Sequence, residues 1–160
     1  MSASPTVPPG ASGPVVRVPY RKVLVAADVG AHRPTSLGPA LKLLELFGAE
    51  GVLCHVVMRS TSAPGNETDG APANPEETEI VRTLRSLSIA ELGEQRGREL
   101  PIKILHGDAG QRICEYAEYA HCDLIIVGPR ERGSIAKSLR GSVSKYVVAN
   151  TRRAVLVLGA

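Results

Sequence analysis

Aromatic residues are scarce in this sequence, and tryptophan is absent. Aromatic side chains make up 3% of the 160 residues, and the single phenylalanine is Phe47. Proteins that bind single-stranded nucleic acid stack the bases on aromatic side chains, so this composition argues against that class. The formal net charge of +3 is too small to indicate nucleic-acid binding by itself.

Long apolar runs are also missing. No run reaches the roughly 18 residues that a membrane-spanning helix needs. The N-terminal stretch, MSASPTVPPGASGPVVRVPY, lacks the basic start and apolar block of a secretory signal. We therefore expect a cytoplasmic protein.

The three cysteines form no CxxC pair. Cys54, Cys114 and Cys122 each lie in an apolar stretch, which favours small buried thiols over a disulfide scaffold. The four histidines are scattered, with no HxxxH pair and no Cys/His ladder. The sequence therefore predicts no metal site.

The chain does contain an alternation of apolar runs and helical patterns. Continuous apolar runs are typical of strands that are buried on both faces of a parallel sheet. The runs cover residues 23–27, 51–57, 101–107, 123–128 and 154–160. Helical patterns separate them, one ending at Gly48, one starting near Pro75, one capped by Asp108, and one from Gly141-Ser142 to about Ala149. This alternation predicts an α/β fold in one domain, a Rossmann-like doubly wound parallel sheet flanked by helices.

Two segments fall outside this pattern. Residues 1–19 are rich in Pro, Gly, Ser and Ala, and we expect a disordered tail there. Residues 59–77 are mostly Pro, Gly, Asn and small polar types, and we expect a mobile loop. The predicted domain is 20–160.

Polar residues and glycines stand where several of the predicted strands end. The first strand ends at Asp28, the second at His55-Val56, and the fourth at Gly128, whose loop leads to Gly141-Ser142 at a helix start. Ligands of open α/β sheets bind beyond the carboxyl ends of the strands, and helix N-termini attract phosphate. The loop also carries positive charge, on Arg130, Arg132, Lys137 and Arg140. A phosphate site is one interpretation, and a solvated basic loop in which Gly141 serves packing is the other.

Several stretches resemble the universal stress protein family. The segment DLIIVGPRERGSIAKSLRGSVSKYVVANTRRAVLVL is similar to the family's C-terminal signature, and KVLVAADVGAHRPTSLGPALKLL to its first strand, turn and helix. GAEGVLCHVV and GDAGQRICEYAEYAHCDLIIVG fit the second strand and the third-helix, fourth-strand unit. The resemblance covers about residues 20–160. It implies a five-stranded parallel sheet and a homodimer formed through the last strand, Ala154 to Leu158.

Some members of the family bind ATP, through Gly, two residues, Gly, nine residues, then Gly followed by Ser or Thr. Gly128 and Gly141-Ser142 match the ends of this motif, and Glu131 replaces the middle glycine. The resemblance implies that Asp28 faces adenine and ribose. The alternative is that Asp28 forms a turn or caps a helix. The full set of implied nucleotide-binding residues is Asp28, Val56, Val127, Gly128, Arg130, Gly133, Gly141, Ser142 and Val143. Val56 could equally be sheet core, and Ser142 could also be a helix cap.

Glu131 should weaken an ATP site. It adds a side chain and a negative charge where the backbone would approach the phosphates. Like charges about 4 Å apart repel by about 1 kcal/mol in water and about 4 kcal/mol at an effective dielectric of 20. Pro129 also removes a backbone donor. In favour of binding, the neighbouring arginines offset the charge of Glu131, and Gly133 could supply backbone flexibility.

Three functions follow. The first is a stress-response regulatory module, a universal stress protein with an impaired site for ATP or another adenine nucleotide. The second is a dimeric universal stress protein that no longer binds nucleotide and acts through protein–protein contacts. The third, an enzyme, has the weakest support, because the sequence lacks a Walker lysine motif, a GxSxG elbow and clustered carboxylates. We therefore expect binding and no catalysis.

Overall fold

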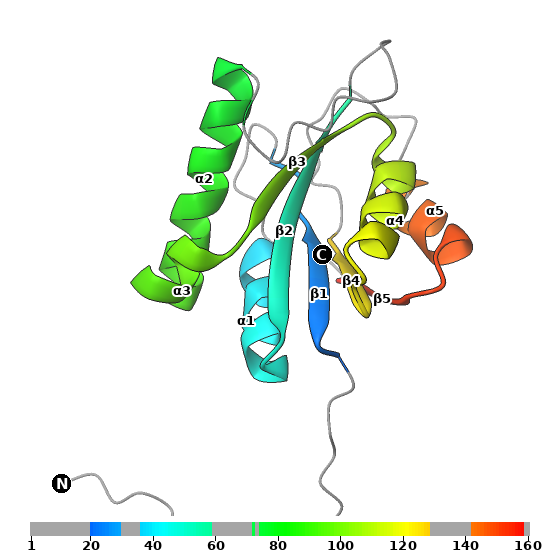
Figure 1. Ribbon diagram of the computed structural model, residues 1–160, viewed down its shortest axis with the longest axis horizontal. Coiled ribbons are helices and arrows are strands. Elements are labelled where there is room, and N and C mark those ends of the chain that lie inside the picture. Colours follow the sequence, from blue (N-terminus) through cyan, green and yellow to red (C-terminus); the bar gives the residue numbers. More distant parts are fainter. Residues whose placement is uncertain (1–19, 30–35, 59–71, 73, 129–141, 159–160) are drawn as a thin grey trace, which may run out of the picture.

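Strands and helices alternate along the chain in the computed structural model, which describes residues 20–29, 36–58, 72, 74–128 and 142–158 (Figure 1). The strands are β1 (Lys22–Ala26), β2 (Glu50–Val57), β3 (Ile102–His106), β4 (Leu124–Val127) and β5 (Ala154–Val157). The helices are α1 (Leu37–Phe47), α2 (Pro75–Leu92), α3 (Glu94–Glu99), α4 (Ala109–Tyr119) and α5 (Ser142–Asn150).

The five strands form one parallel sheet in the order β3-β2-β1-β4-β5. This confirms the predicted α/β fold with a doubly wound, five-stranded parallel sheet. The chain first builds outward from β1 to β3, then returns to the other side of β1 with β4. The switch in strand order therefore lies between β1 and β4, where Ala26 pairs with Val127. In sheets of this kind, that switch point marks the expected ligand site.

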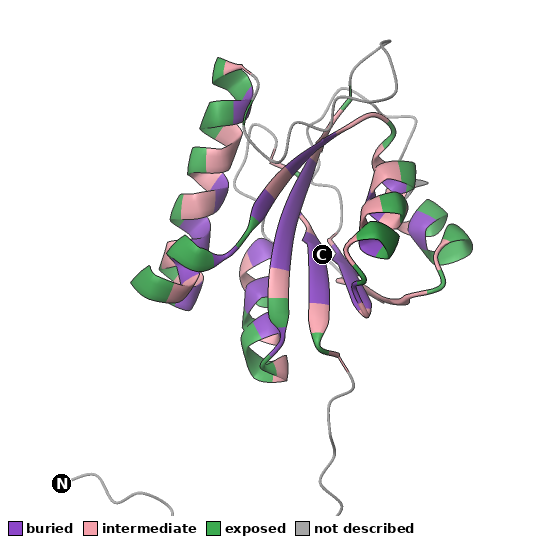
Figure 2. Ribbon diagram, in the orientation of Figure 1, coloured by how far each residue is buried: buried purple, intermediate pink, exposed green. Residues whose placement is uncertain are grey.

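Helices cover both faces of the sheet, with α1, α2 and α3 on one side and α4 and α5 on the other (Figure 1). Successive side chains of a strand point to opposite faces. Accordingly, Val23 and Val25 belong to the core cluster that contains α1 and α2 residues, whereas Leu24 belongs to the cluster with α4 and α5. All three are fully or almost fully buried, and Figure 2 shows burial running along the central strands.

Capping residues fix several helix ends where the sequence predicts them. Gly48 adopts a left-handed conformation with φ of 60° and ends α1. Pro75 is the first residue of α2, and the side chain of Asn74 accepts a hydrogen bond from the Glu77 amide. The Asp108 side chain caps α4 by accepting from the Gln111 amide at 3.0 Å.

The short helix α3 has no counterpart in the sequence prediction. Gly93 interrupts the helical run with φ of 83°, and the chain then forms one further turn and a half that packs on α2. Arg85 of α2 secures this turn, since its Nη1 donates to the Gly97 and Leu100 carbonyl oxygens at 2.7 and 2.6 Å.

Two of the predicted segments lie largely outside the described residues. The tail at 1–19 is one of them. The loop predicted at 59–77 ends earlier than expected, because Pro75, Glu76 and Glu77 already form the first turn of α2. The segments 59–71 and 73 are outside the described ranges.

The cysteine side chains are buried to different degrees. Cys54 and Cys122 are fully buried and Cys114 is partly buried; all three are free thiols. Burial, with a smaller contribution from Cys122, raises the pKa of the Cys54 thiol to about 12. Cys54 is therefore a packing residue and a poor nucleophile at neutral pH.

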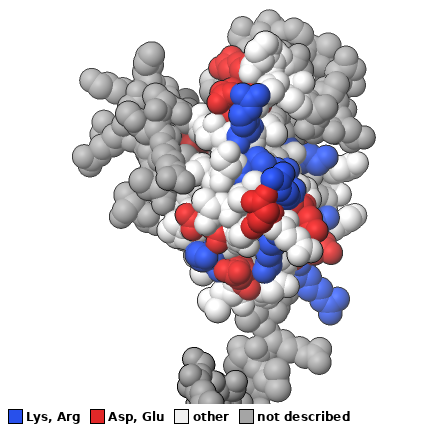
Figure 3. Space-filling view, turned by 90° about the vertical axis from the view of Figure 1, so that its left-hand side faces the viewer, with Lys and Arg blue, Asp and Glu red and all other residues white. Residues whose placement is uncertain are grey.

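Lysine and arginine alternate with acidic residues on the face formed by α2 and α3 (Figure 3). Pairs within the helices account for part of this pattern, including Arg82 with Glu79 at 2.8 Å and Arg98 with Glu94. Among the helices in the described ranges, none has the length and apolar character that a membrane span requires.

Asp123 joins the start of β4 to the start of β1, and it gives a prediction about pH. Its carboxylate accepts the backbone amides of Lys22 and Arg21 at 2.9 and 2.8 Å, which lowers the pKa of Asp123. A lowered pKa means that this stabilisation is present above the unfolded pKa of about 3.9 and is lost as the pH falls through the folded value.

We therefore expect Asp123→Asn to reduce the free energy of unfolding by about 1 kcal/mol at pH 7, as measured by urea denaturation. The difference from wild type should shrink below pH 4. Glu50→Gln, which removes an exposed carboxylate from β2, is the control for charge alone. A deficit in Asp123→Asn that stays constant down to pH 2 would contradict this account.

Candidate functional site

The carboxyl ends of β1 and β4 bring two of the predicted site residues to one edge of the sheet. Asp28 follows β1 by two residues and is exposed, and Gly128 directly follows β4 and is partly buried. Because Ala26 and Val127 are paired neighbours, Asp28 and Gly128 leave adjacent parallel strands at the same end. The sequence prediction that these strand ends converge is consistent with this geometry.

The helix α5 starts at Ser142 toward the same edge. Since β4 and β5 are parallel neighbours, the helix between them must run back across the sheet, with its N-terminus toward the carboxyl ends of the strands. The backbone amides of its first turn lack partners within the helix and carry partial positive charge. This end of the sheet therefore carries the acidic side chain of Asp28 after β1 and the N-terminus of α5 after β4.

Three predicted site valines share one apolar cluster. Val127 is 2% exposed and belongs to the core on the α4 and α5 face, against which the partly buried Val56 and Val143 pack. Val56 and Val127 lie on β2 and β4, with β1 between them, so about 10 Å separates their strands. Val56 and Val127 belong to the sheet and Val143 to α5, and together they form one apolar cluster on the α4 and α5 face of the sheet.

The remaining predicted residues fall outside the description. Arg130, Gly133 and Gly141 lie outside the described residues, as does Glu131. Ser142 is placed as the first residue of α5, but its side chain is not described. The phosphate-facing half of the predicted site is therefore untested by the geometry.

Gly128 has a packing reason to be glycine that the sequence prediction missed. A Cβ atom at this position would collide with the side chain of Ser36, approaching its Cβ to 2.6 Å and its Oγ still more closely. Ser36 is the residue before α1, so the start of α1 lies directly against the end of β4. Nothing in the sequence spacing indicates this contact, because it depends on where Ser36, at the start of α1, packs against the sheet.

We expect Gly128→Ala to lower the free energy of unfolding by about 1–3 kcal/mol, because an added methyl group overpacks the contact with Ser36. The double variant Gly128→Ala with Ser36→Gly should recover most of the loss. The measurement is chemical denaturation followed by circular dichroism, which suits a chain without tryptophan. If the second substitution restores nothing, Ser36 is not the reason for the glycine.

A buried histidine holds the turn that carries Asp28. His55 of β2 is 7% exposed, and its Nδ1 lies 2.9 Å from the Ala27 carbonyl oxygen and 3.3 Å from the Val29 amide nitrogen. These two backbone groups flank Asp28. The sequence places His55 at the end of the second strand but gives no sign of this contact, because the partners are backbone atoms 26 and 28 positions away.

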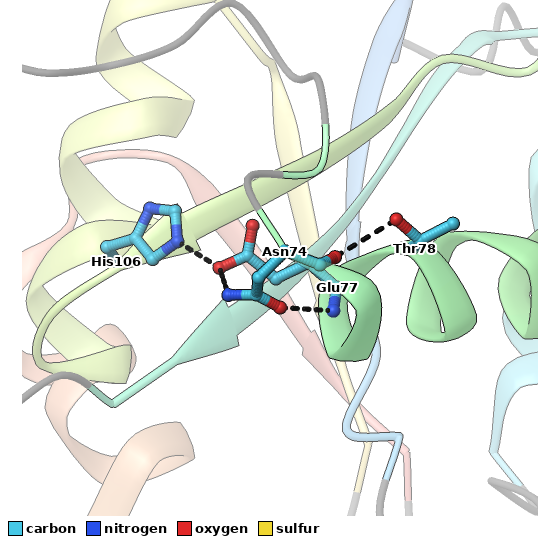
Figure 4. A network of polar contacts seen from close by, with 4 residues as sticks. All are labelled: Asn74, Glu77, Thr78 and His106. Atoms are coloured by element: carbon cyan, nitrogen blue, oxygen red, sulfur yellow. Dashed lines mark hydrogen bonds and ion pairs between the residues drawn. The ribbon is translucent and has the colours of Figure 1, made fainter.

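A second polar cluster lies at the end of β3 (Figure 4). The carboxylate of Glu77 is 1% exposed, and its Oε1 lies 2.8 Å from His106 Nε2 and 3.1 Å from Asn74 Nδ2. The cluster joins the N-terminus of α2 to the last residue of β3. Sequence reasoning counts Glu77 among acidic residues of a first helical turn and misses its burial.

A shallow hollow of about 580 Å³ opens beside this cluster, at the N-terminus of α2. Pro72, Asn74, Pro75, Thr78, Glu79 and Arg82 line it. None of these is a predicted nucleotide-binding residue. In the described part of the chain, His, Cys, Asp and Glu side chains form no group of three that could hold a metal ion.

The sequence profile of the universal stress protein family matches residues 19–159. The chain belongs to this family. A universal stress protein of Methanocaldococcus jannaschii is 25% identical over 145 residues, which cover 87% of this chain and 82% of the relative. The family assignment confirms the resemblance inferred from the strand and loop motifs.

Solved structures of family members have the same fold. The universal stress protein UspA from Lactobacillus plantarum matches with a TM-score of 0.63 and 21% identity, covering 87% of this chain and 97% of that one. A universal stress protein in complex with cAMP matches with a TM-score of 0.60 and 18% identity, covering 87% and 96%. At these identities the likeness shows the fold alone.

Proposed function

We propose that the protein is a regulatory module that binds an adenine nucleotide at the carboxyl ends of β1 and β4. The observation that carries the proposal is the pairing of these two strands at the switch point, which sets Asp28 beside Gly128. Asp28 would face the adenine and ribose. The amides at the start of α5 would face the phosphates.

Family membership supports the proposal, and so does the relative whose structure contains cAMP. The apolar cluster of Val56, Val127 and Val143 supports it as well, because Val56 and Val143 are only partly buried and nucleotide bases bind against apolar side chains with few polar contacts. ATP is the ligand that the glycine motif favours. Glu131, in place of the middle glycine, should keep the affinity low.

The second candidate is a universal stress protein that has no nucleotide and acts through protein contacts. The Ser36 contact favours it, because packing alone explains why residue 128 is glycine. The edge strand β5 also favours it: Val157 is 47% exposed, and apolar sheet edges are seldom left uncovered. Both candidates include a homodimer formed through Ala154 to Leu158, a cytoplasmic location, and binding in place of catalysis.

Titration calorimetry with ATP and with cAMP, each with and without magnesium, tests the proposal. We expect saturable binding of at least one of the two nucleotides. Absence of heat at millimolar ligand would retire the nucleotide proposal and leave the second candidate. Phosphate release from ATP at the rate of a protein-free control is the expected result for a binding module.

Two substitutions at Glu131 separate charge from bulk. Glu131→Gly should tighten ATP binding by about tenfold or more, because it removes both the side chain and the repulsion. Glu131→Gln, the matched control, removes only the charge and should give part of this gain. Equal or weaker ATP affinity in Glu131→Gly would show that this position does not limit binding.

The dimer has its own test. Light scattering at micromolar concentration should give twice the mass of 16.9 kDa for the wild type. Val157→Lys places a charge on the exposed edge and should give a monomer. A monomeric wild type would remove the dimer from both candidates.

A further inference from the structure

His55 faces the strand turn on which the proposed nucleotide site depends. Among the described residues, the buried polar or charged side chains are those of His55, Glu77 and Ser88. Glu77 is bonded to His106 and Asn74, and Ser88 donates to the carbonyl of its own helix at Leu84. His55 differs because its ring nitrogen reaches a neighbouring strand at the point where that strand ends.

The contacts of His55 bracket one residue. The Ala27 carbonyl precedes Asp28 and the Val29 amide follows it, and both lie within hydrogen-bond distance of the same Nδ1 atom. The turn is otherwise tied to β2 by the Ala27 amide, which donates to the Cys54 carbonyl at 2.9 Å. These hydrogen bonds of Ala27 and Val29 therefore run to two consecutive residues of β2, Cys54 and His55.

The proton on the ring decides which bond forms. When Nδ1 carries the proton, it donates to the Ala27 carbonyl; when the proton is on Nε2, the bare Nδ1 accepts from the Val29 amide. One nitrogen cannot do both at once. Both groups lie within reach of Nδ1, at 2.9 Å for the Ala27 oxygen and 3.3 Å for the Val29 nitrogen, so either tautomer ties His55 to the backbone next to Asp28.

We infer that His55 is a positioning residue, which holds the backbone next to Asp28, at the Ala27 carbonyl in one tautomer or at the Val29 amide in the other, and so sets the direction of that carboxylate. The consequence for binding rests on the proposed function. A backbone segment that is already ordered loses less conformational entropy when the nucleotide binds, so the affinity is higher. A histidine that merely fills the core would have no effect on the turn beyond its effect on overall stability.

Three variants separate these roles. His55→Asn places an amide group near the position of Nδ1, His55→Gln places it one carbon further out, and His55→Leu keeps the bulk without a polar atom. For each variant we would measure hydrogen exchange of the Ala27 and Val29 amides by nuclear magnetic resonance, global stability by denaturation, and nucleotide affinity by calorimetry.

We expect His55→Leu to speed exchange of the Ala27 amide, the Val29 amide or both at least tenfold beyond what its loss of global stability explains, and to weaken nucleotide binding by about tenfold. His55→Asn should stay within about threefold of wild type in both measurements. If His55→Leu does not fold, His55→Gln takes its place, with the same expected direction and a smaller size.

The inference about His55 and the proposed nucleotide binding can fail separately. If wild type binds neither ATP nor cAMP, the nucleotide proposal fails, but the exchange of the Ala27 and Val29 amides still decides whether His55 holds the backbone next to Asp28. Unchanged exchange in His55→Leu and His55→Gln overturns the inference. The inference is also overturned if His55→Asn and His55→Leu have the same global stability and the same amide exchange rates, because the position of the polar atom would then not matter.

Discussion

Replacing His106 with leucine should lower the free energy of unfolding by about 2–3 kcal/mol, in a domain whose total is on the order of 10 kcal/mol. The reason is the carboxylate of Glu77, which is 1% exposed and bonded to His106 at 2.8 Å. Removing one partner from a buried ionisable pair takes away part of what compensates the carboxylate for its lost hydration. Urea denaturation at pH 7, followed by circular dichroism, is the measurement.

A second substitution shows whether the buried charge is the cause. Glu77→Gln in the His106→Leu background removes the charge but keeps an amide that can still bond to Asn74. We expect this double variant to be more stable than His106→Leu alone, by at least half of the original loss. Thr78→Val, which removes an exposed hydroxyl bonded to the Asn74 carbonyl, is the control within the cluster and should change stability by less than about 0.5 kcal/mol. A double variant that is less stable than His106→Leu would contradict the explanation.

The second large effect is expected at Gly97, where α3 packs on α2. A Cβ at this position would lie 2.5 Å from the Ile89 nitrogen and 2.7 Å from the Ser88 carbonyl carbon, and closer still to the Ile89 Cα. These are backbone atoms of a helix, which cannot rotate away as a side chain can. Gly97→Ala must therefore push the two helices apart, and we expect a loss of about 3 kcal/mol in thermal or chemical unfolding.

Gly38 of α1 is the matched control. A Cβ there would meet the carboxylate of Glu91, at 3.2 Å from its Oε1, and the end of a flexible side chain can move. Gly38→Ala should change stability by less than about 1 kcal/mol, because alanine loses less backbone freedom in a helix, whereas the ring of Pro39 crowds a Cβ on the residue before it. If both variants lose the same amount, the cause is general crowding by the added methyl group, and not the contact of α3 with the α2 backbone.

The sheet and most helices follow from local signals in the sequence. Runs such as 23–27 predict β1 because buried parallel strands need no polar alternation. Gly48 marks a helix end through its left-handed backbone, and Asp108 marks a helix start through its side chain. The meeting of Asp28 and Gly128 follows from a general rule about parallel strands. These features depend on short stretches of chain or on topology, which is why they are predictable.

The features that the sequence does not reveal depend on distant contacts. Glu77 reads as an ordinary acidic residue in the first turn of a helix, whereas its burial is decided by His106, 29 positions away. Ser36 against Gly128 and His55 against Ala27 and Val29 are of the same kind. Each contact joins residues that are far apart in the sequence and meet only when the chain packs. Neither residue type nor spacing therefore predicts it.

The place of β1 in the middle of the sheet has a consequence for biosynthesis. Its pairing with β4 joins positions about 100 residues apart, Val23 with Leu124, so β1 leaves the ribosome long before that partner exists. During this interval β1 can pair with β2, while its other side remains open to unwanted association. Strands that are far apart in the sequence also pair slowly. The new domain therefore remains prone to aggregation until β4 and β5, which are synthesised last, have joined the sheet.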